Sequence, residues 1–479
     1  MLRSLALFCL TLPTQPLLAA ADKPNVVLIV IDDLGQRDLG CYGSGFYETP
    51  NVDRLAESGM RFTQYYAANP VCSPTRASLQ TGRNPARLNL TNFLKGVRQK
   101  KDSPMLTAEY VDQLPLEEVT LGEMFKTAGY QTAFVGKWHL GGESFYPEPQ
   151  GYDVNIGGTH AGHPKSYFWP QWQNNPPVEG EREGQYLTDL LSERACEWIE
   201  SAAKNEQPFF LSLCHYTVHT PIQPREDLLK KYEDKLSRIR LREGSQSNPH
   251  YAAMVESMDT SVGRVLDTLD RLKIADDTLV IFTADNGGLS VQEGKHTPAT
   301  TNAPLRMGKG YLYDGGIRVA FIVRWPGVTP AGSTCDVPAI SDDVFPTLCR
   351  AAGVETEKLQ LAGPLDGRDL SNVLKGETDA ALSDRPLHWH YPHFANQGGP
   401  PGGAIRVGDW KLIEWFEDGT LELYNLADDL SETTDLAAEQ PDRIRDMRAA
   451  LSQWRREVHA NMPTANPAYE GAATPVIER

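Results

Sequence analysis

The chain is short of basic residues: 46 Lys and Arg stand against 63 Asp and Glu, which gives a formal net charge of -17. A groove that follows a nucleic-acid backbone needs clustered basic side chains, so this balance argues against one. A few basic residues in a closed pocket still suffice to bind a small anion. We therefore expect no nucleic acid as a partner and any anion site to be local.

Long apolar runs are also missing. A helix that spans a bilayer needs about 20 mainly apolar residues, and the apolar stretch near the N-terminus is interrupted by Pro13 and Pro16. The stretch starts after Arg3 and ends in Ala19–Ala21, which is typical of a cleavable signal peptide, although a buried first strand or helix would look similar. We predict a signal peptide at residues 1–21, no transmembrane segment, and export to the periplasm or the medium.

Cysteines are few, and none of the seven shows the paired spacing of a zinc site. Cys9 falls in the predicted signal peptide. In an oxidising compartment Cys196 could pair with Cys214, or Cys335 with Cys349, but spacing alone does not assign a connectivity.

What the sequence does contain is an alternation of strand and helix patterns. Asn25–Ile31 is a continuous apolar run rich in β-branched residues, as in a strand buried on both faces. Similar runs recur, with helical patterns between them. The further expected strands are Thr132–Val135, Phe209–Leu213, Thr278–Thr283 and Val319–Val323, and the expected helices include Asn51–Ser58, Thr120–Ala128 and Tyr251–Leu272. This alternation predicts an α/β sandwich with helices covering a sheet.

The pattern changes near residue 375. Short strand patterns follow at Arg406–Val407, Trp410–Glu414 and Leu421–Tyr424, with the turn signal Asp418-Gly419 before the last. Residues 440–459 then form an amphipathic helical pattern. The predicted organisation is a large α/β domain at 22–375, a smaller α+β subdomain at 376–460, and a tail at 461–479.

Polar residues follow several of the apolar runs directly. The segments concerned are Asp32-Asp33, Gly136–His139, His215–His219 and Asp285-Asn286. In open α/β sheets ligands bind beyond the carboxyl ends of the strands, where the loops converge. Polar residues that are far apart in the sequence are therefore expected to meet in one crevice.

Four of these residues offer oxygen ligands: Asp32, Asp33, Asp285 and Asn286. Adjacent carboxylates repel each other unless a cation or a proton compensates. An oxygen-only set favours calcium or magnesium over zinc. Asp-Asp and Asp-Asn most often cap helices or form turns, but their joint placement after buried strands indicates a metal site.

Cys72 stands just before an expected helix, with Pro74 in its first turn. A helix N-terminus offers unpaired N–H groups to an anion, and Arg76, one turn further on, could face the same bound group. A buried thiol followed by an ordinary capped helix would have the same pattern. These residues by themselves indicate no more than an anion site.

Two motifs resemble the signatures of the type I sulfatases, which depend on formylglycine, in the branch of the arylsulfatases and carbohydrate sulfatases. The first is Cys72-x-Pro74-x-Arg76, continuing to Thr81-Gly82-Arg83, and the second is the segment Gly129–His139. The likeness extends from Asn25 to about Pro326. Two long motifs in the right order argue against a chance match. The resemblance implies an alkaline-phosphatase-like sulfatase fold.

The resemblance also implies the contents of the site. Cys72 would be oxidised to formylglycine by a formylglycine-generating enzyme or an anaerobic sulfatase-maturating enzyme. One calcium ion would be bound by Asp32, Asp33, Asp285 and Asn286, with the modified Cys72 completing the sphere.

In the implied reaction, one hydroxyl of the hydrated aldehyde attacks sulfur, forms a sulfate ester on residue 72 and expels the alcohol. The second hydroxyl then loses its proton, the aldehyde re-forms and sulfate leaves. His139 would take that proton, and His219 would be the general acid, a role that Lys309 could share. The basic residues that would neutralise the sulfate are Arg76, Lys137 and Lys309.

The expected substrate is a sulfated carbohydrate, a galactose-type or hexosamine sulfate. His163 and His393 lie in segments rich in His and aromatic residues, and we expect both to contact the sugar, although a packed aromatic cluster would have the same composition. His215 is interpreted as a structural residue.

Two alternatives differ in chemistry. A phosphatase or phosphodiesterase of the same superfold would hold two zinc ions through several His ligands and use a Thr or Ser nucleophile, whereas here Asn286 follows Asp285 and residue 72 is Cys. A sulfated-glycan binder without catalysis would retain the thiol at Cys72.

Overall fold

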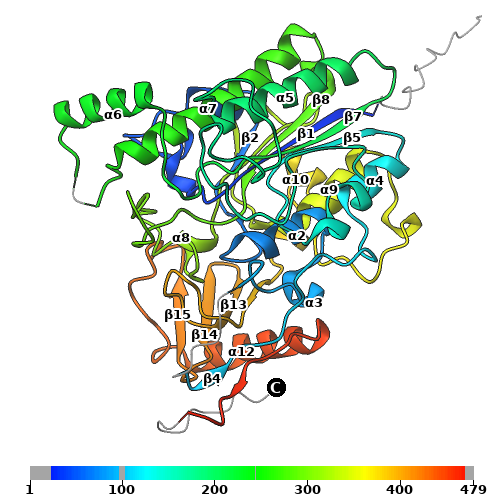
Figure 1. The fold of residues 1–479 in the computed structure, drawn as a ribbon. Helices are drawn as coiled ribbons and strands as arrows, with labels where there is room; N and C mark the ends of the chain where they lie inside the picture. The colour runs from blue at the N-terminus through cyan, green and yellow to red at the C-terminus, as the bar shows by residue number, and fades with distance from the viewer. Residues whose placement is uncertain (1–22, 97–102, 243, 470–479) are drawn as a thin grey trace, which may run out of the picture.

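The computed structural model describes residues 23–96, 103–242 and 244–469 and contains one eight-stranded and one four-stranded sheet, with two short two-stranded pairings (Figure 1). The predicted signal peptide lies outside the described residues, as do residues 470–479 of the predicted tail. Among the described helices, none is both long and apolar enough to cross a membrane.

The large sheet is mixed, with β1 (Asn25–Ile31) near its centre between two parallel neighbours, β7 (Phe209–Cys214) and β8 (Thr278–Ala284). β5 (Gln131–Gly136) continues the parallel set beyond β7, and β9 (Phe321–Arg324) runs antiparallel to β8. The remaining strands are β2 (Met60–Phe62), β6 (Val154–Ile156) and β10 (Ser333–Cys335). The buried residues of β1 lie between two layers of helices, as the apolar run predicted.

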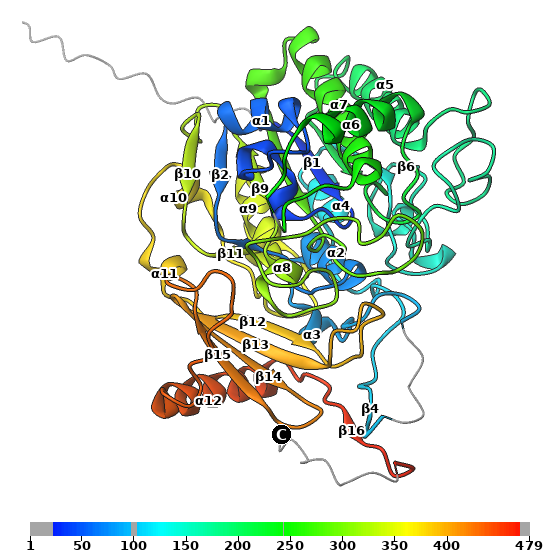
Figure 2. The same cartoon turned by 90° about the vertical axis from the view of Figure 1, so that its left-hand side faces the viewer.

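Helices cover both faces of this sheet (Figures 1 and 2). One layer contains α1 (Pro50–Glu57), α5 (Leu187–Ala202), α6 (Glu226–Arg238) and α7 (Pro249–Arg271). The other contains α2 (Cys72–Thr81), α4 (Leu121–Thr127), α9 (Val344–Ala351) and α10 (Ser371–Leu374). Local sequence fixes several ends: Thr120 and Glu123 form a capping box at α4, and Asn248 caps α7 before Pro249.

The remaining α-helices and strands are short. They are α3 (Pro85–Leu88), α8 (Asp314–Ile317), α11 (Ala380–Ser383), the pair β3 (Tyr65–Tyr66) and β11 (Ala339–Ile340), and the pair β4 (Met105–Leu106) and β16 (Thr464–Ala465). The strand predicted at 319–323 begins only at Phe321, because Val319 N instead donates to Tyr65 O of β3.

The small sheet is antiparallel, and α12 (Pro441–Glu457) packs on one face (Figure 2). Its strands in order are β12 (Leu387–Tyr391), β13 (Gly402–Val407), β14 (Trp410–Trp415) and β15 (Leu421–Asn425). Successive side chains point to opposite faces: Ile405 packs with Met447 of α12, whereas Ala404 belongs to a cluster with Tyr66 and Ile317 of the larger part. The sequence did not predict β12.

Lys411 joins this sheet to the larger part through a buried ion network. Its Nζ lies 2.7 Å from Asp314 Oδ1 at α8 and 2.7 Å from Glu432 Oε1, and all three side chains are inaccessible. The Asp314 N–H also donates to Glu432 Oε2 at 2.7 Å. Because each buried charge has an opposite partner, the network fixes β14 against α8.

Gly136 ends β5 in a conformation that other residues rarely adopt. Its φ is 102°, and a Cβ added there would lie 1.9 Å from Cys214 O of β7. The next residue, Lys137, donates its N–H to the same carbonyl at 2.7 Å. Gly136 therefore allows the close backbone approach that places Lys137.

The six described cysteines are all unpaired, so both suggested disulfides are wrong. Cys214 belongs to β7 and contacts the space beside Arg76 of α2, whereas Cys196 is on α5 in the opposite helix layer (Figure 1). Cys335 ends the edge strand β10, and Cys349 is buried in α9.

Replacing Gly136 with Ala is expected to destabilise the protein by at least about 2 kcal/mol, because the left-handed backbone and the contact with Cys214 O both oppose a side chain. Thermal unfolding measures the loss. Gly142→Ala is the control, since a Cβ there meets nothing within 4 Å. Equal unfolding temperatures for the two variants would contradict the close approach.

Lys411→Met is expected to cost about 3–5 kcal/mol, because it leaves Glu432 buried without its lysine and Asp314 with Arg318 alone. Denaturant unfolding followed by tryptophan fluorescence gives the value. Lys358→Met removes an exposed pair with Glu355 and should change stability by less than about 1 kcal/mol. A loss of that small size in Lys411→Met would refute the network's role.

Candidate active site

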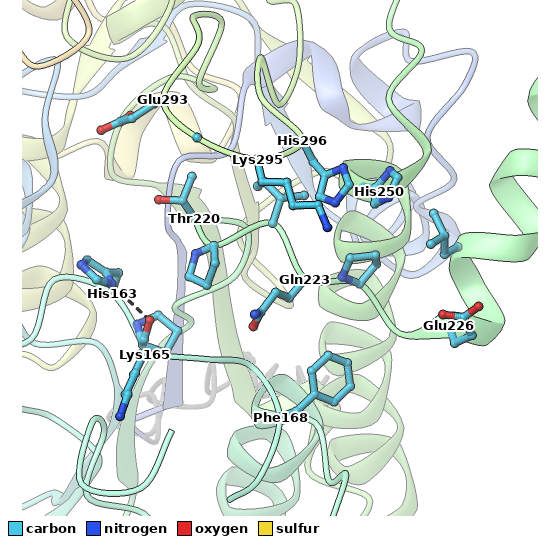
Figure 3. A pocket seen from close by; sticks show the side chains of 16 residues that line it. His163, Lys165, Phe168, Thr220, Gln223, Glu226, His250, Glu293, Lys295 and His296 are labelled. Carbon is cyan, nitrogen blue, oxygen red and sulfur yellow. Dashed lines mark hydrogen bonds between the residues drawn. The ribbon is translucent and has the colours of Figure 1, made fainter. Parts of the chain in front are cut away.

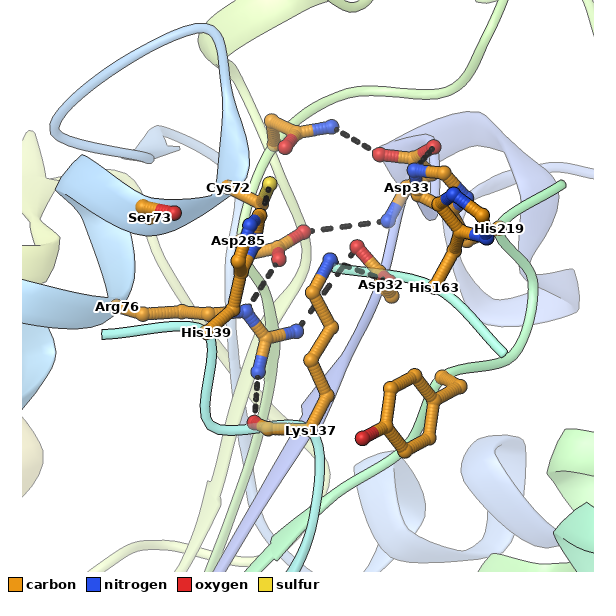
Figure 4. A network of polar contacts seen from close by, with 12 residues as sticks. Asp32, Asp33, Cys72, Ser73, Arg76, Lys137, His139, His163, His219 and Asp285 are labelled. Atoms are coloured by element: carbon orange, nitrogen blue, oxygen red, sulfur yellow. Dashed lines mark hydrogen bonds and ion pairs between the residues drawn. The ribbon is translucent and has the colours of Figure 1, made fainter. Parts of the chain in front are cut away.

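The carboxyl ends of β1, β5, β7 and β8 meet at one edge of the large sheet, beside the N-terminus of α2. Asp32 and Asp33 follow β1, Lys137 follows β5, and Asp285 follows β8. Cys72 is the first residue of α2. Figure 4 shows these side chains pointing toward one another. The crevice predicted from the strand ends is thus observed.

Two buried cations hold two of the carboxylates. Lys137 Nζ lies 2.7 Å from Asp32 Oδ2, and Arg76 Nε donates to Asp285 Oδ2 at 2.8 Å. Arg76 Nη1 also donates to Lys137 O at 2.6 Å (Figure 4). The three contacts tie α2 to the ends of β1, β5 and β8.

Lys309 pairs with the third carboxylate from the loop after β8. Its Nζ lies 2.7 Å from Asp33 Oδ2 and 2.9 Å from His219 Nε2. Asn286 Nδ2 donates to Asp33 Oδ1 at 2.8 Å. Both Asp33 and His219 therefore contact Lys309, which is itself nearly inaccessible.

Two buried oxygens in this cluster lack a hydrogen-bond partner among the described residues: Asp32 Oδ1 and Asn286 Oδ1. A buried unpaired oxygen costs free energy unless a cation or another donor satisfies it. Asp32, Asp33 and His219 also offer ligand atoms that lie within 4.8 Å of one another. The donor set is mainly oxygen, so the cluster fits a hard cation.

The two adjacent carboxylates differ in proton affinity. Burial raises the pKa of Asp32 well above its usual value, and the charges of Lys137 and Arg76 offset this only in part. For Asp33 the effect of burial is outweighed by Lys309 and then by His219, so its pKa is lowered. Further positive charge beside Asp32 is needed to keep both carboxylates ionised.

His139 presents a ring nitrogen to residue 72. Its Nε2 lies 2.7 Å from Leu94 O, which only accepts, so Nε2 carries the hydrogen and Nδ1 is the free acceptor. Cys72 Sγ lies 3.4 Å from this Nδ1. Burial, followed by the charge of Lys137, lowers the pKa of His139 well below its usual value, so the ring is neutral.

Burial raises the pKa of the Cys72 thiol, despite the charges of Lys137 and Lys309. The thiolate is the nucleophilic form of cysteine. An unmodified residue 72 is therefore a weak nucleophile in this position.

A cavity of about 330 Å³ lies above this cluster. Of the predicted site residues, Cys72, His139, His163, His219 and Lys309 line it. Arg76 and Lys137 are absent from its lining, as are the four predicted oxygen ligands. Arg76 and Lys137 contact Asp285 and Asp32 beneath the cavity. Lining residues that the sequence did not indicate are Phe93, Leu94, Gly162, Thr220, Glu293, Asn396 and Gln397. Gly162 and Thr220 adjoin the predicted residues His163 and His219 in the sequence. The other five belong to loops without a motif, so no sequence signal marks them.

The two histidines predicted to contact the sugar lie in different surroundings. His163 is exposed at the cavity, and its ring stacks on His219 with centroids 5.7 Å apart (Figure 4). His393 is only 1% exposed; its Nε2 lies 2.8 Å from Thr91 Oγ1, and it does not line the cavity. The segment around His393 is a packed cluster. His215 is buried, and its Nε2 lies 2.7 Å from Ser261 Oγ, as expected of a structural residue.

Comparison with known proteins identifies the family to which this site belongs. The family model described as Sulfatase matches residues 24–354, and that described as N-sulphoglucosamine sulphohydrolase, C-terminal, matches residues 306–458. A sulfatase from Formosa agariphila is 33% identical, with 94% of this chain and 93% of that protein covered. Human arylsulfatase A is 32% identical, over 90% of this chain and 82% of its own. Human N-acetylgalactosamine-6-sulfatase is also 32% identical, over 78% and 69%.

Solved structures of related proteins have a similar fold. Ps i-CgsB in complex with k-i-k-neocarrahexaose superposes with a TM-score of 0.74 at 30% identity, covering 90% of this chain and 93% of that one. A phosphonate monoester hydrolase of Agrobacterium radiobacter shares the fold alone, with a TM-score of 0.62 at 19% identity over 92% and 99% of the two chains.

The sulfatase model covers more than half of the chain, and the relatives match along most of their own length. The resemblance inferred from the Cys72–Arg83 and Gly129–His139 motifs is confirmed, as is the predicted alkaline-phosphatase-like α/β fold with a separate C-terminal part. The chain belongs to the sulfatase family and is a sulfuric ester hydrolase.

Proposed function

We propose that this sulfatase removes sulfate from a sulfated carbohydrate, a galactose-type or hexosamine sulfate, using formylglycine at position 72 and one calcium ion. The observation that carries the proposal is the meeting of Cys72 with three carboxylates and three buried cations beneath one cavity. Relatives named N-acetylgalactosamine-6-sulfatase and a similar structure holding a neocarrahexaose support a sugar substrate.

Asp32, Asp33, Asp285, Asn286 and residue 72 would hold the calcium ion. The unpartnered oxygens of Asp32 and Asn286 support this assignment. When bound, calcium would supply Lewis-acid polarisation of the sulfate and fix the nucleophile's position.

The charge balance explains why the site would attract an anion. Arg76, Lys137 and Lys309 already compensate Asp32, Asp33 and Asp285. A dication added to this balanced cluster gives the site a net positive charge that a sulfate neutralises. Lys309 is the cation at the cavity wall and would contact the sulfate, whereas Arg76 and Lys137 would position Asp285 and Asp32.

Two histidines would take part in proton transfer. His139 Nδ1 is the acceptor that faces residue 72, so it would take the proton that a hydroxyl there releases. His219 Nδ1 lies 2.8 Å from Thr220 O and therefore carries a hydrogen, which leaves His219 Nε2 facing Lys309 Nζ. This His219–Lys309 pair would protonate the leaving oxygen.

The proposal includes the chain's processing. The signal peptide at 1–21 would be removed on export to the periplasm or the medium, and a maturating enzyme would oxidise Cys72. The catalytic domain would comprise residues 22–375, the C-terminal subdomain 376–460 and the tail 461–479.

Cys72→Ala is expected to lower kcat for sulfate release at least about 1,000-fold, because it removes the nucleophile, with an unchanged unfolding temperature. Mass spectrometry of the tryptic peptide 62–76 of the wild type should show an aldehyde in place of the thiol. A fully active enzyme with an intact thiol would refute the role of formylglycine. Turnover of phosphate esters without sulfate esters would refute the sulfatase proposal.

Chelation followed by dialysis is expected to abolish turnover and lower the unfolding temperature, since a ligand at 100 times its Kd stabilises by about 2.7 kcal/mol. Calcium should restore both. Asn286→Ala is the matched variant, because it removes one oxygen ligand and should weaken the response to calcium. Full activity in the metal-free enzyme, or restoration by zinc and not by calcium, would exclude the assigned ion.

A further inference from the structure

A second cavity, of about 700 Å³, adjoins the reaction cavity (Figure 3). The two share three wall residues, His163, Thr220 and Glu293. Its volume lies within the range of about 300–1,000 Å³ found for pockets that bury a ligand. The three shared residues place the two cavities directly beside each other.

The rings of His250 and His296 stack on each other in the wall of this second cavity, with ring centroids 3.6 Å apart and planes 18° apart (Figure 3). Asn248 Nδ2 donates to His296 O at 2.8 Å and to Pro298 O at 3.0 Å. His296 has a φ of 64°, which is uncommon for a residue with a side chain. The loop is thus held in one conformation against the start of α7, which places the two rings together.

Lys295 lies beside these rings, and its ammonium group forms no salt bridge with the described residues. Among the described residues, no carboxylate oxygen lies within 4.0 Å of its ammonium group. Burial lowers the pKa of His250; the charge of Glu233 opposes this, and that of Lys295 adds to it. Burial also lowers the pKa of His296, with smaller contributions from His250 and Lys295. Both pKa values lie below the usual value for histidine, so both rings are neutral at neutral pH. Lys295 is therefore the positive group beside the two rings, and the cavity's other lysine is Lys165; both are exposed.

The acidic residues of the cavity do not neutralise Lys295. Glu293 and Glu226 lie toward opposite sides in Figure 3, with Lys295 between them. Glu293 Oε2 already accepts a hydrogen bond from Gln397 Nε2 at 2.9 Å. An anion beside His296 would therefore meet Lys295, while Glu293 is held by Gln397.

Polar and apolar groups suited to a sugar ring lie opposite. Gln223 Oε1 accepts from Ser166 Oγ at 3.1 Å and from Tyr167 N at 2.9 Å, which orients the carboxamide. Its Nε2 hydrogens are left to donate to a ligand hydroxyl. Phe168 presents a half-buried ring to the same cavity (Figure 3).

We propose that the second cavity binds the sugar unit next to the sulfated one, and that Lys295 contacts an anionic substituent, a sulfate or a carboxylate, on that unit. This proposal rests on the proposed function and narrows the substrate to an oligosaccharide that is anionic on both units. The ring of Phe168 packs against the sugar ring, the stacked pair of His250 and His296 borders it, and Gln223 donates to its hydroxyls.

The test compares sulfate release from four substrates that share the same sulfated terminal sugar. These are the monosaccharide, a disaccharide with a neutral neighbouring unit, one whose neighbour carries a carboxylate, and one whose neighbour carries a sulfate. The wild type should have a higher kcat/KM for at least one of the two anionic disaccharides than for the neutral one. The preferred form identifies the substituent.

Lys295→Gln should lower kcat/KM on the preferred anionic disaccharide about tenfold, the size expected for losing one charged hydrogen bond, and leave the monosaccharide unchanged. Lys204→Gln is the control, an exposed lysine before the amino end of β7 and therefore on the far edge of the sheet. Lys204→Gln should leave kcat/KM unchanged on all four substrates.

A wild type that prefers the neutral disaccharide overturns the subsite. So does a Lys295→Gln effect that is equal on all four substrates or absent from all. If a wild type with confirmed formylglycine releases sulfate from none of the four, the proposed carbohydrate substrate fails instead, and the subsite fails with it.

Discussion

Three carboxylates that follow the central strands must share one buried volume, and the site depends on how their repulsion is compensated. Asp32, Asp33 and Asp285 are almost inaccessible, and each lies within 2.8 Å of a buried cation. Buried like charges are costly without such partners. The compensating cations come from α2, from the residue after β5 and from the loop after β8. Their positions therefore fix these segments relative to one another.

The positions of the compensating cations distinguish residues that hold the cluster from residues that can reach the substrate. Arg76 and Lys137 contact two of the carboxylates beneath the cavity, so they hold the cluster, whereas Lys309 and His219 reach the cavity. Cys72 is placed at the cavity by the first turn of α2, where burial disfavours its thiolate. A thiol in this environment gains little from its surroundings as a nucleophile, which agrees with the proposed conversion to an aldehyde hydrate.

The C-terminal sheet contributes to the site although it carries none of the charged cluster. Asn396 and Gln397, in the loop between β12 and β13, line the reaction cavity, and Gln397 bonds to Glu293. The Lys411 network and an apolar cluster around Tyr66 hold this sheet in place. The stability of that junction and the shape of the pocket are consequently coupled.

Much of the fold was predictable because apolar runs and turn signals are local. The core strands β1, β5, β7 and β8 were predicted to within about two residues, the usual uncertainty of element ends. β12 was missed because His388, His390 and Tyr391 do not look like an apolar run. The disulfide suggestions failed because spacing says nothing about which face of the sheet a cysteine occupies, and Cys214 and Cys196 lie on opposite sides.

The sequence by itself determined the family, since Cys72–Arg83 and Gly129–His139 are contiguous motifs, and it indicated the oxygen ligands at the strand ends. Only the tertiary structure decided that His163 lines the cavity while His393 is buried against Thr91, and that Arg76 and Lys137 contact their carboxylates beneath the cavity. It alone placed Lys295 with His250 and His296. The physical reason is that a motif records neighbours along the chain, whereas burial and charge pairing depend on which distant loops converge at one sheet edge.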